Sequence, residues 1–304
     1  MKGPRIGLLA VLVALPLATF WAAAPQAAAS APASASAGVD FDVNTCDSCH
    51  DSALASMKTT PHAGLEQSCA SCHDGVTAHV KAQMEGTEAP TPSLSKLSAE
   101  ALSGKCLTCH DNGRQANWAG GAHDRKDVSC TSCHSVHTFK SVKGQLKTAR
   151  DAETCFTCHQ QIRAKGMRAS HHPVREGLMS CGSCHDPHDG TRTKMVSADY
   201  VNEKCLECHT EKRGPFLWEH APVRENCLNC HDAHGSNHEK LLVAKQPYLC
   251  QRCHLNTRHP GTLYDGRNVT LAPSASNRLI EHSCRNCHQN IHGGNAPSGP
   301  YLGR

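Results

Sequence analysis

The pattern Cys-x-x-Cys-His occurs ten times in this 304-residue chain and accounts for all of its 20 cysteines. Two thiols three residues apart lie on one side of a helical turn, where each can bond to one vinyl group of the same porphyrin. The histidine after the second cysteine then lies under the iron as an axial ligand. This is the attachment pattern of c-type haem, so the sequence predicts ten covalently bound haems.

In chain order, the motifs are the first to the tenth. The predicted attachment residues are Cys46, Cys49, Cys69, Cys72, Cys106, Cys109, Cys130, Cys133, Cys155, Cys158, Cys181, Cys184, Cys205, Cys208, Cys227, Cys230, Cys250, Cys253, Cys284 and Cys287. The histidines that complete the motifs, called motif histidines below, are His50, His73, His110, His134, His159, His185, His209, His231, His254 and His288.

Two other uses of cysteine fit this pattern poorly. Zinc knuckles also contain Cys-x-x-Cys, but they pair around one ion and do not need a histidine directly after each second cysteine. A disulfide scaffold is conceivable in an exported chain. Joining cysteines only three residues apart would close very small loops and would hold nothing distant together.

The N-terminus has the features of a secretory signal. A charged start at Lys2 and Arg5 precedes an apolar stretch and small residues at 27–29. We expect residues 1–29 to be a cleaved signal peptide, with cleavage after Ala29 or, alternatively, after Ala35 or Ala37. A membrane anchor is the other interpretation of such a stretch. No second apolar run follows, so the mature chain is predicted to be periplasmic, with no lipid-spanning segment.

The composition predicts a core filled by haem. Aromatic residues make up 4% of the chain, and the mean hydropathy is −0.47. A chain with so few core residues cannot offset its conformational entropy by burying its own side chains. The predicted fold class is mostly irregular, with short α-helices, a haem-packed core and almost no β-sheet.

The formal charge does not indicate an anionic partner. The chain carries +4 at pH 7 before haem is counted. Each bis-histidine ferric haem with ionised propionates adds negative charge, so the loaded protein is acidic. The sequence therefore gives no reason to expect binding to nucleic acid.

The motifs come in five pairs, which predicts a quasi-linear array of five tandem di-haem modules. The array makes an elongated molecule. Between the modules we expect a flexible N-terminal segment, a linker that contains a short helix capped by Ser98, and a flexible tail. The predicted segments are 30–45 (N-terminal segment), 46–80 (module one), 81–105 (linker), 106–138 (module two), 155–190 (module three), 205–238 (module four), 250–293 (module five) and 294–304 (tail).

The remaining histidines supply a second axial ligand for each iron. Thirteen of the 23 histidines lie outside the motifs, and each module follows the order motif, histidine, motif, histidine. We call the two histidines of a module that lie outside its motifs the middle and the trailing histidine. The predicted distal ligands are His62, His79, His123, His137, His171, His188, His220, His234, His259 and His292.

Some of these assignments are left open by the sequence. His172 is an alternative to His171, although alignment with His220 favours His171; His282 is an alternative to His259. A trailing histidine lies beside its own motif and must ligate a neighbouring haem, which we expect to tie the two motifs of a module together. Spacing does not reveal which histidine serves which haem. Methionine, the other common ligand, does not recur in the modules, although Met84 lies near His79.

Two strong nitrogen ligands on every iron leave no open position for a substrate, which predicts an electron carrier and not an enzyme. Multihaem enzymes such as nitrite reductases and hydroxylamine oxidases need a vacant haem, whereas all ten motifs here end in histidine and distal candidates are in surplus. No catalytic residue is predicted. A freely diffusing periplasmic electron shuttle is the alternative to a fixed wire.

Three stretches carry a resemblance to a known family. They are Ser170–Gly177, Cys230–Ser236 and Ser283–Gly293. With the ten paired motifs, they resemble the MtrA/DmsE family of decahaem cytochromes, which includes iron-oxidation relatives of the MtoA and PioA kind. The resemblance covers the chain from about Cys46 to its end.

The resemblance implies an outer-membrane β-barrel porin as partner, into which the cytochrome is threaded. It further implies a surface multihaem cytochrome as a possible second partner, and periplasmic or inner-membrane electron carriers as donors or acceptors. The implied function is electron transfer between periplasm and cell surface, for metal reduction or iron oxidation. The direction of flow is not implied.

Overall fold

The computed structural model describes residues 43–64, 69–88, 91–141, 143–254, 283–297 and 299–303. All of them belong to one compact unit, Asp40–Arg304, and a separate unit covers Met1–Val39. The predicted signal peptide and most of the predicted N-terminal segment therefore lie outside the described residues, as do His259 and His282.

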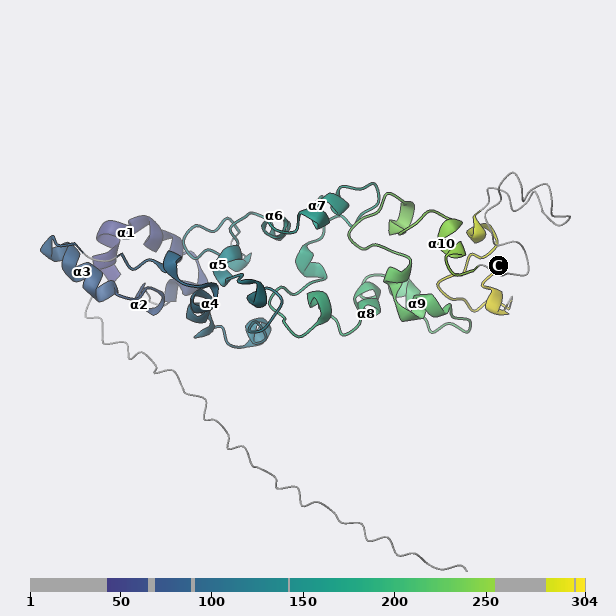
Figure 1. Ribbon diagram of the computed structural model, residues 1–304, viewed down its shortest axis with the longest axis horizontal. Helices are drawn as coiled ribbons and strands as arrows, with labels where there is room; N and C mark the ends of the chain where they lie inside the picture. The colour runs from purple at the N-terminus through teal and green to yellow at the C-terminus, as the bar shows by residue number, and fades with distance from the viewer. Residues whose placement is uncertain are drawn as a thin grey trace, which may run out of the picture. The chain divides into compact units, whose positions relative to one another are not determined.

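Short helices joined by loops make up the described chain (Figure 1), as the sequence predicts. The α-helices are α1 (Val43–Met57), α2 (Cys69–Cys72), α3 (Val76–Glu85), α4 (Ala99–Leu107), α5 (Cys130–Cys133), α6 (Asp151–Phe156), α7 (Gln160–Gly166), α8 (Val201–Leu206), α9 (Ala221–Glu225) and α10 (Tyr248–Gln251). The 3₁₀ turns are η1 (Pro61–Gly64), η2 (Leu94–Lys96), η3 (Gly113–Gln115), η4 (Asp124–Lys126), η5 (Lys143–Gln145), η6 (Cys181–Ser183), η7 (Thr193–Met195), η8 (Thr210–Lys212), η9 (Cys227–Asn229), η10 (Glu239–Leu241), η11 (Cys284–Asn286) and η12 (Gly299–Tyr301). Within the described residues, β pairing is limited to isolated bridges, which confirms the expectation of almost no sheet.

The motifs themselves form the helical turns. The second motif of each module is a single turn, as in α2, α5 and η6, whereas in modules two to four the first motif begins at the C-terminal end of a longer helix, namely α4, α6 or α8. α4 shows why such a helix begins where it does. The Ser98 hydroxyl accepts a hydrogen bond from the Ala101 backbone N–H at 3.2 Å, which caps the helix as predicted. The helix then runs to Leu107, so that Cys106 lies in its last turn.

The described polypeptide has almost no apolar core of its own. Trp118 and Ala152 are its only buried apolar residues, with exposed fractions of 7% and 5%. No large side chain among the described residues is completely buried. A folded unit with so little self-packing needs another source of buried apolar surface, which agrees with the predicted haem-packed interior.

Backbone hydrogen bonds join successive modules at equivalent positions. The residue two before a middle histidine pairs with the residue two after the trailing histidine of the next module. Ser170 and Ser236 exchange bonds of 3.0 and 2.8 Å, and Trp218 and Gly294 exchange two of 3.0 Å. At the boundary of modules two and three, Gly190 N–H instead donates to the Asn117 carbonyl at 3.0 Å.

The segments predicted as linker and tail have more structure than expected. Segment 81–105 contains the end of α3, η2 and most of α4. The tail contains η12, and its Gly303 carbonyl accepts a hydrogen bond from the Asn290 side chain at 2.7 Å. Backbone carbonyls of the tail thus bond back to the tenth motif region within the described residues.

No helix of the described residues has the length and apolar character needed to cross a membrane.

Candidate functional site

Nine motif histidines each face a histidine from outside the motifs. The ring centres of these pairs are 5.9 to 6.5 Å apart. The pairs are His50–His79, His62–His110, His73–His137, His123–His159, His134–His188, His172–His209, His185–His234, His220–His254 and His231–His292. The tenth motif histidine is His288, and both of its predicted partners lie outside the described residues.

This separation fits one metal ion between two imidazoles. A metal–imidazole bond is about 2 Å long, and the ring centre lies about 1 Å beyond the bonding nitrogen. Two such arms place the ring centres about 6 Å apart. Since a motif with two thiols accompanies each pair, the arrangement fits a covalently attached haem with two histidine ligands.

The pairs follow a rule that spacing did not reveal. Each middle histidine of modules one to four faces the first motif histidine of the next module, as His62 faces His110. Each trailing histidine of modules two to five faces the second motif histidine of the preceding module, as His188 faces His134. Among the described pairs, only that of His79 with His50 stays within one module. The trailing histidines therefore join successive modules, and the expectation that they tie together the motifs of one module holds only in module one.

In module three, the histidine opposite a motif histidine is His172. Its ring centre is 6.4 Å from that of His209. His171, which alignment favours, turns away: its Nε2 lies 3.1 Å from a Glu176 carboxylate oxygen and its Nδ1 lies 2.6 Å from the Arg168 carbonyl. His172 Nδ1 donates instead to the Ala233 carbonyl at 2.9 Å, across the boundary to module four. Met84, the methionine near His79 in the sequence, is 74% exposed. The ring that faces His50 is that of His79.

The cysteines bring consecutive motifs together in an alternating pattern. Within each module, the thiols of the first cysteines of both motifs contact one another, as those of Cys106 and Cys130 do. Across three of the module boundaries, the second cysteines of consecutive motifs interact electrostatically, as Cys72 does with Cys109 and Cys133 with Cys158; at the boundary of modules three and four, Cys184 interacts with both Cys205 and Cys208. The ten motifs therefore follow one another in chain order.

Second-motif histidines are oriented by backbone carbonyls. Their Nδ1 atoms lie 2.5 to 3.0 Å from carbonyl oxygens, which fixes Nδ1 as the donor and leaves Nε2 for a metal. The acceptors for His73, His134, His185, His231 and His288 are the carbonyls of Pro92, Gly144, Lys194, Lys240 and Tyr301, respectively.

Three of these acceptors belong to turns with a left-handed backbone. Gly144, Lys194 and Lys240 have φ values of 77°, 53° and 57°. In each turn the next residue is also left-handed, with φ between 50° and 59°. Such conformations are costly for non-glycine residues and cluster at functional positions. Here they aim a carbonyl at a motif histidine.

Several distal rings are partly buried, which favours the neutral form that binds metal. Burial lowers the pKa of His188, His220 and His234 below the ordinary value, and it lowers the pKa of His292 to about 4. A neutral imidazole has a free lone pair on Nε2 when Nδ1 carries the proton.

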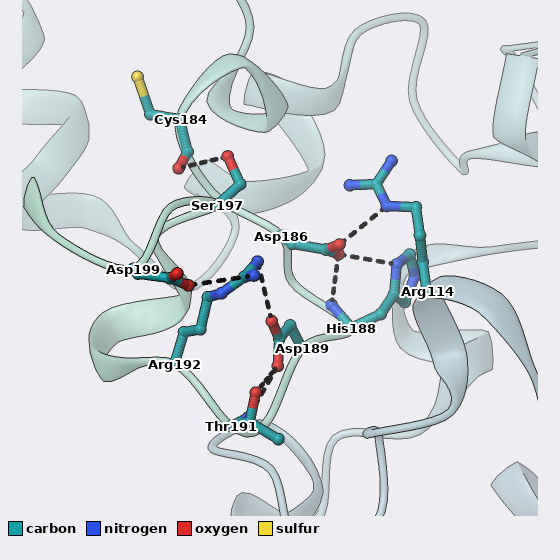
Figure 2. Close-up of polar contacts among 9 residues, drawn as sticks. All are labelled: Arg114, Cys184, Asp186, His188, Asp189, Thr191, Arg192, Ser197 and Asp199. Atoms are coloured by element: carbon teal, nitrogen blue, oxygen red, sulfur yellow. Dashed lines mark hydrogen bonds and ion pairs between the residues drawn. The ribbon is translucent and has the colours of Figure 1, made fainter. Parts of the chain in front are cut away.

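A carboxylate lies against two of these distal rings. Figure 2 shows Asp186 between Arg114 and His188. The Arg114 guanidinium lies 2.8 Å from Asp186 Oδ2, and the other carboxylate oxygen accepts the His188 backbone N–H at 3.1 Å. Burial opposes ionisation of Asp186, but the hydrogen bonds from Arg114 and His188 outweigh it and lower its pKa. Asp232 occupies the equivalent position beside His234.

The indole of Trp118 lies near two histidines that face different motifs. Its ring centre is 6.4 Å from that of His123 and 6.3 Å from that of His188. Sequence reasoning missed Trp118 and the two aspartates. The recurrence of Cys-His-Asp-x-His at 184–188 and 230–234 is the signal that could have revealed the aspartates.

Comparisons with known proteins agree with this geometry. The family model described as "Doubled CXXCH motif" matches residues 123–164, 171–214 and 220–259. The chain is 39% identical over 212 residues to multiheme cytochrome MtrA of Shewanella baltica (strain OS185), an alignment that covers 69% of this chain and 63% of that protein.

Two more distant relatives are also cytochromes. High-molecular-weight cytochrome c of Nitratidesulfovibrio vulgaris (strain Hildenborough) is 25% identical over 158 residues, which cover 51% of this chain and 26% of that protein. Cytochrome c-type protein NrfB of Escherichia coli O6:H1 is 24% identical over 127 residues, which cover 36% of this chain and 65% of that protein. The chain thus spans less than two thirds of each of these three relatives.

Proposed function

The chain belongs to the MtrA-type family of multihaem c-type cytochromes, and we propose that it conducts electrons along ten bis-histidine haems bound in chain order. The observation that carries this proposal is the register of the nine histidine pairs, each of which combines a motif histidine with a histidine from outside the motifs. A bound haem supplies one-electron chemistry at its iron.

The residues proposed to hold the haems are the 20 cysteines, the ten motif histidines and ten distal histidines. His172 replaces His171 in the distal set, because His172 faces His209. For His288 we retain His259 as the proposed partner, with His282 as the alternative. Both lie in module five, so the last module would close on itself as module one does through His50 and His79.

These ligands make the protein a conductor and not a catalyst. Two imidazoles on each iron leave no coordination position for a substrate, and rigid ligands keep reorganisation small when the charge changes. The carbonyls that hold the motif histidines, and the cross-module bonds such as that from His172 to Ala233, support such rigidity. The similarity to a multiheme cytochrome agrees with this reading.

We further propose that the chain works between periplasm and cell surface, inserted in an outer-membrane porin. The similarity to MtrA and the predicted secretory signal support this placement. A surface multihaem cytochrome and a periplasmic electron carrier are the partners that such a wire needs at its two ends.

Co-purification of the tagged, haem-loaded full chain from native membranes tests the placement. Mass spectrometry of the isolated complex should identify a large outer-membrane β-barrel at a constant ratio to the cytochrome. Recovery of the cytochrome alone, in the soluble periplasmic fraction, would contradict the porin proposal and would indicate a diffusing electron shuttle. The intact mass of the same preparation should exceed that of the polypeptide by ten haems.

A further inference from the structure

Asp186 and Asp232 occupy the same position in successive modules. Each follows a second-motif histidine directly and precedes a trailing histidine by two residues. Their side chains are largely buried, with exposed fractions of 13% and 20%. In each, Oδ1 accepts the backbone N–H of the trailing histidine at 3.1 Å. The same oxygen lies 3.4 Å from His188 Nδ1 in one case and 3.9 Å from His234 Nδ1 in the other.

A cation from the preceding module holds the other carboxylate oxygen. Arg114 of module two lies 2.8 Å from Asp186 Oδ2, and Lys165 of module three lies 2.6 Å from Asp232 Oδ2. The cation therefore fixes the carboxylate so that its Oδ1 faces the distal ring (Figure 2). The carboxylate therefore brings negative charge to the Nδ1 edge of each distal ring.

Two other second-motif sites lack the carboxylate. Ser135 stands at this position in module two, and its hydroxyl lies 2.9 Å from that of Thr138. Gln289 stands there in module five. The distal rings at the second and eighth motifs thus have no carboxylate at this position, whereas those at the fourth and sixth motifs face one.

Charge beside an axial ligand changes the reduction potential of the iron. A carboxylate at the Nδ1 edge makes the imidazole a stronger donor and stabilises ferric over ferrous iron. Partial burial weakens solvent screening of this effect. A cation at the same edge has the opposite effect.

We propose that Asp186 and Asp232 are potential-setting residues that make the haems of the fourth and sixth motifs more reducing than those of the second and eighth motifs. The proposal rests on the ligation proposed above. It places one more strongly reducing haem on each side of the fifth haem in chain order. Electrons that pass through the protein must therefore move onto haems of lower reduction potential near its middle.

The test is a spectropotentiometric titration of the full haem-loaded chain and of Asp186→Asn and Asp232→Asn. In each variant, one tenth of the total absorbance change should move from the low-potential end of the titration curve to a higher potential. We expect an about tenfold change in the ferrous-to-ferric ratio of that haem, or about 59 mV for a one-electron couple. The matched control is Asp199→Asn, because this carboxylate is 75% exposed and pairs with Arg192.

The cations supply a test that a purely structural role would fail. Arg114→Gln and Lys165→Gln leave each carboxylate without its counter-charge, so the same haems should move to lower potential, opposite to the aspartate variants. Gln289→Asp should lower one further component, from the eighth motif. Shifts of the same sign in the aspartate and cation variants would overturn the proposal, as would unchanged titrations in all of them.

Failure of the ligation proposal would show separately. In that case the mass of the unsubstituted protein would correspond to fewer than ten haems, or its iron would be partly high-spin. Both results would be seen before any variant is compared.

Discussion

At the scale of single residues, the direction of the backbone decides which histidine meets a motif histidine. His171 and His172 are adjacent, yet only His172 faces His209, while His171 bonds to Glu176 and the Arg168 carbonyl. Alignment with the segment around His220 favoured His171. Sequence similarity, however, carries no information on the direction of a side chain. The local chain places the second histidine of the pair toward the next module.

Replacing each of these histidines by alanine separates their roles. His172→Ala should leave the haem of the seventh motif with one protein ligand, so a high-spin ferric signal equal to about one tenth of the iron should appear. His171→Ala is the matched control and should keep all iron low-spin. Electron paramagnetic resonance of the oxidised proteins measures both. High-spin iron in the His171 variant alone would reverse the assignment.

The angles between paired rings predict two classes of haem. His134–His188 and His185–His234 are nearly parallel, at 22° and 10°, whereas His62–His110 is crossed at 72°. Parallel ligand planes split the iron d orbitals and give rhombic low-spin spectra, whereas crossed planes give highly anisotropic ones. Electron paramagnetic resonance of the oxidised protein should resolve both kinds of signal. A single uniform rhombic spectrum would contradict these angles.

At the scale of elements, glycine permits the close approach of modules three and four. A Cβ on Gly235, whose φ is 141°, would lie 2.0 Å from the Lys165 carbonyl oxygen in α7. No real Cβ contact is that short, so a side chain would push α7 away from the loop that holds His234. The same loop carries Asp232, which pairs with Lys165.

Gly235→Ala should therefore destabilise the haem-loaded protein by about 2 kcal/mol or more, through backbone strain and the displaced contact. Gly104→Ala is the matched control, because nothing lies within 4 Å of its added Cβ and it lies inside α4. That change should stabilise by about 0.5–1 kcal/mol. Denaturant titration followed by the haem absorption compares the two, and equal effects would count against the close packing.

The same scale shows what the sequence can predict and what it cannot. The motifs, the fivefold pairing and the short helices were predictable because covalent attachment requires those residues at those spacings. The pairing of His62 with His110 was not predictable, because it depends on how one module folds back on the next. The contacts of the tail were not predictable for a related reason. Its content of glycine and proline does not reveal that the Tyr301 carbonyl accepts a hydrogen bond from His288 Nδ1 at 2.7 Å.

At the scale of the whole molecule, the described polypeptide has little core without haem. Only Trp118 and Ala152 are buried apolar residues there, and eight of the nine observed histidine pairs bridge two modules. The proposed haem ligation would therefore hold the modules together as well as place the irons. Loss of one haem would then weaken the junction between two modules as well as one binding site.

The haem-free chain should not fold cooperatively. Expressed without haem attachment and kept reduced, it should show little fixed structure, because its apolar side chains alone cannot offset the conformational entropy. Hydrogen exchange should find almost no protected amides, in contrast to the haem-loaded protein. A cooperative unfolding transition in the haem-free chain would show that the polypeptide has a core of its own.

Near-infrared magnetic circular dichroism of the oxidised, fully loaded protein tests the central claim most directly, because the energy of its charge-transfer band identifies the axial ligands of low-spin haem. The account predicts a single bis-histidine band whose intensity corresponds to ten haems per chain. A histidine–methionine band, or an intensity that leaves one or more haems high-spin, would contradict the claim that every iron is closed by two histidines.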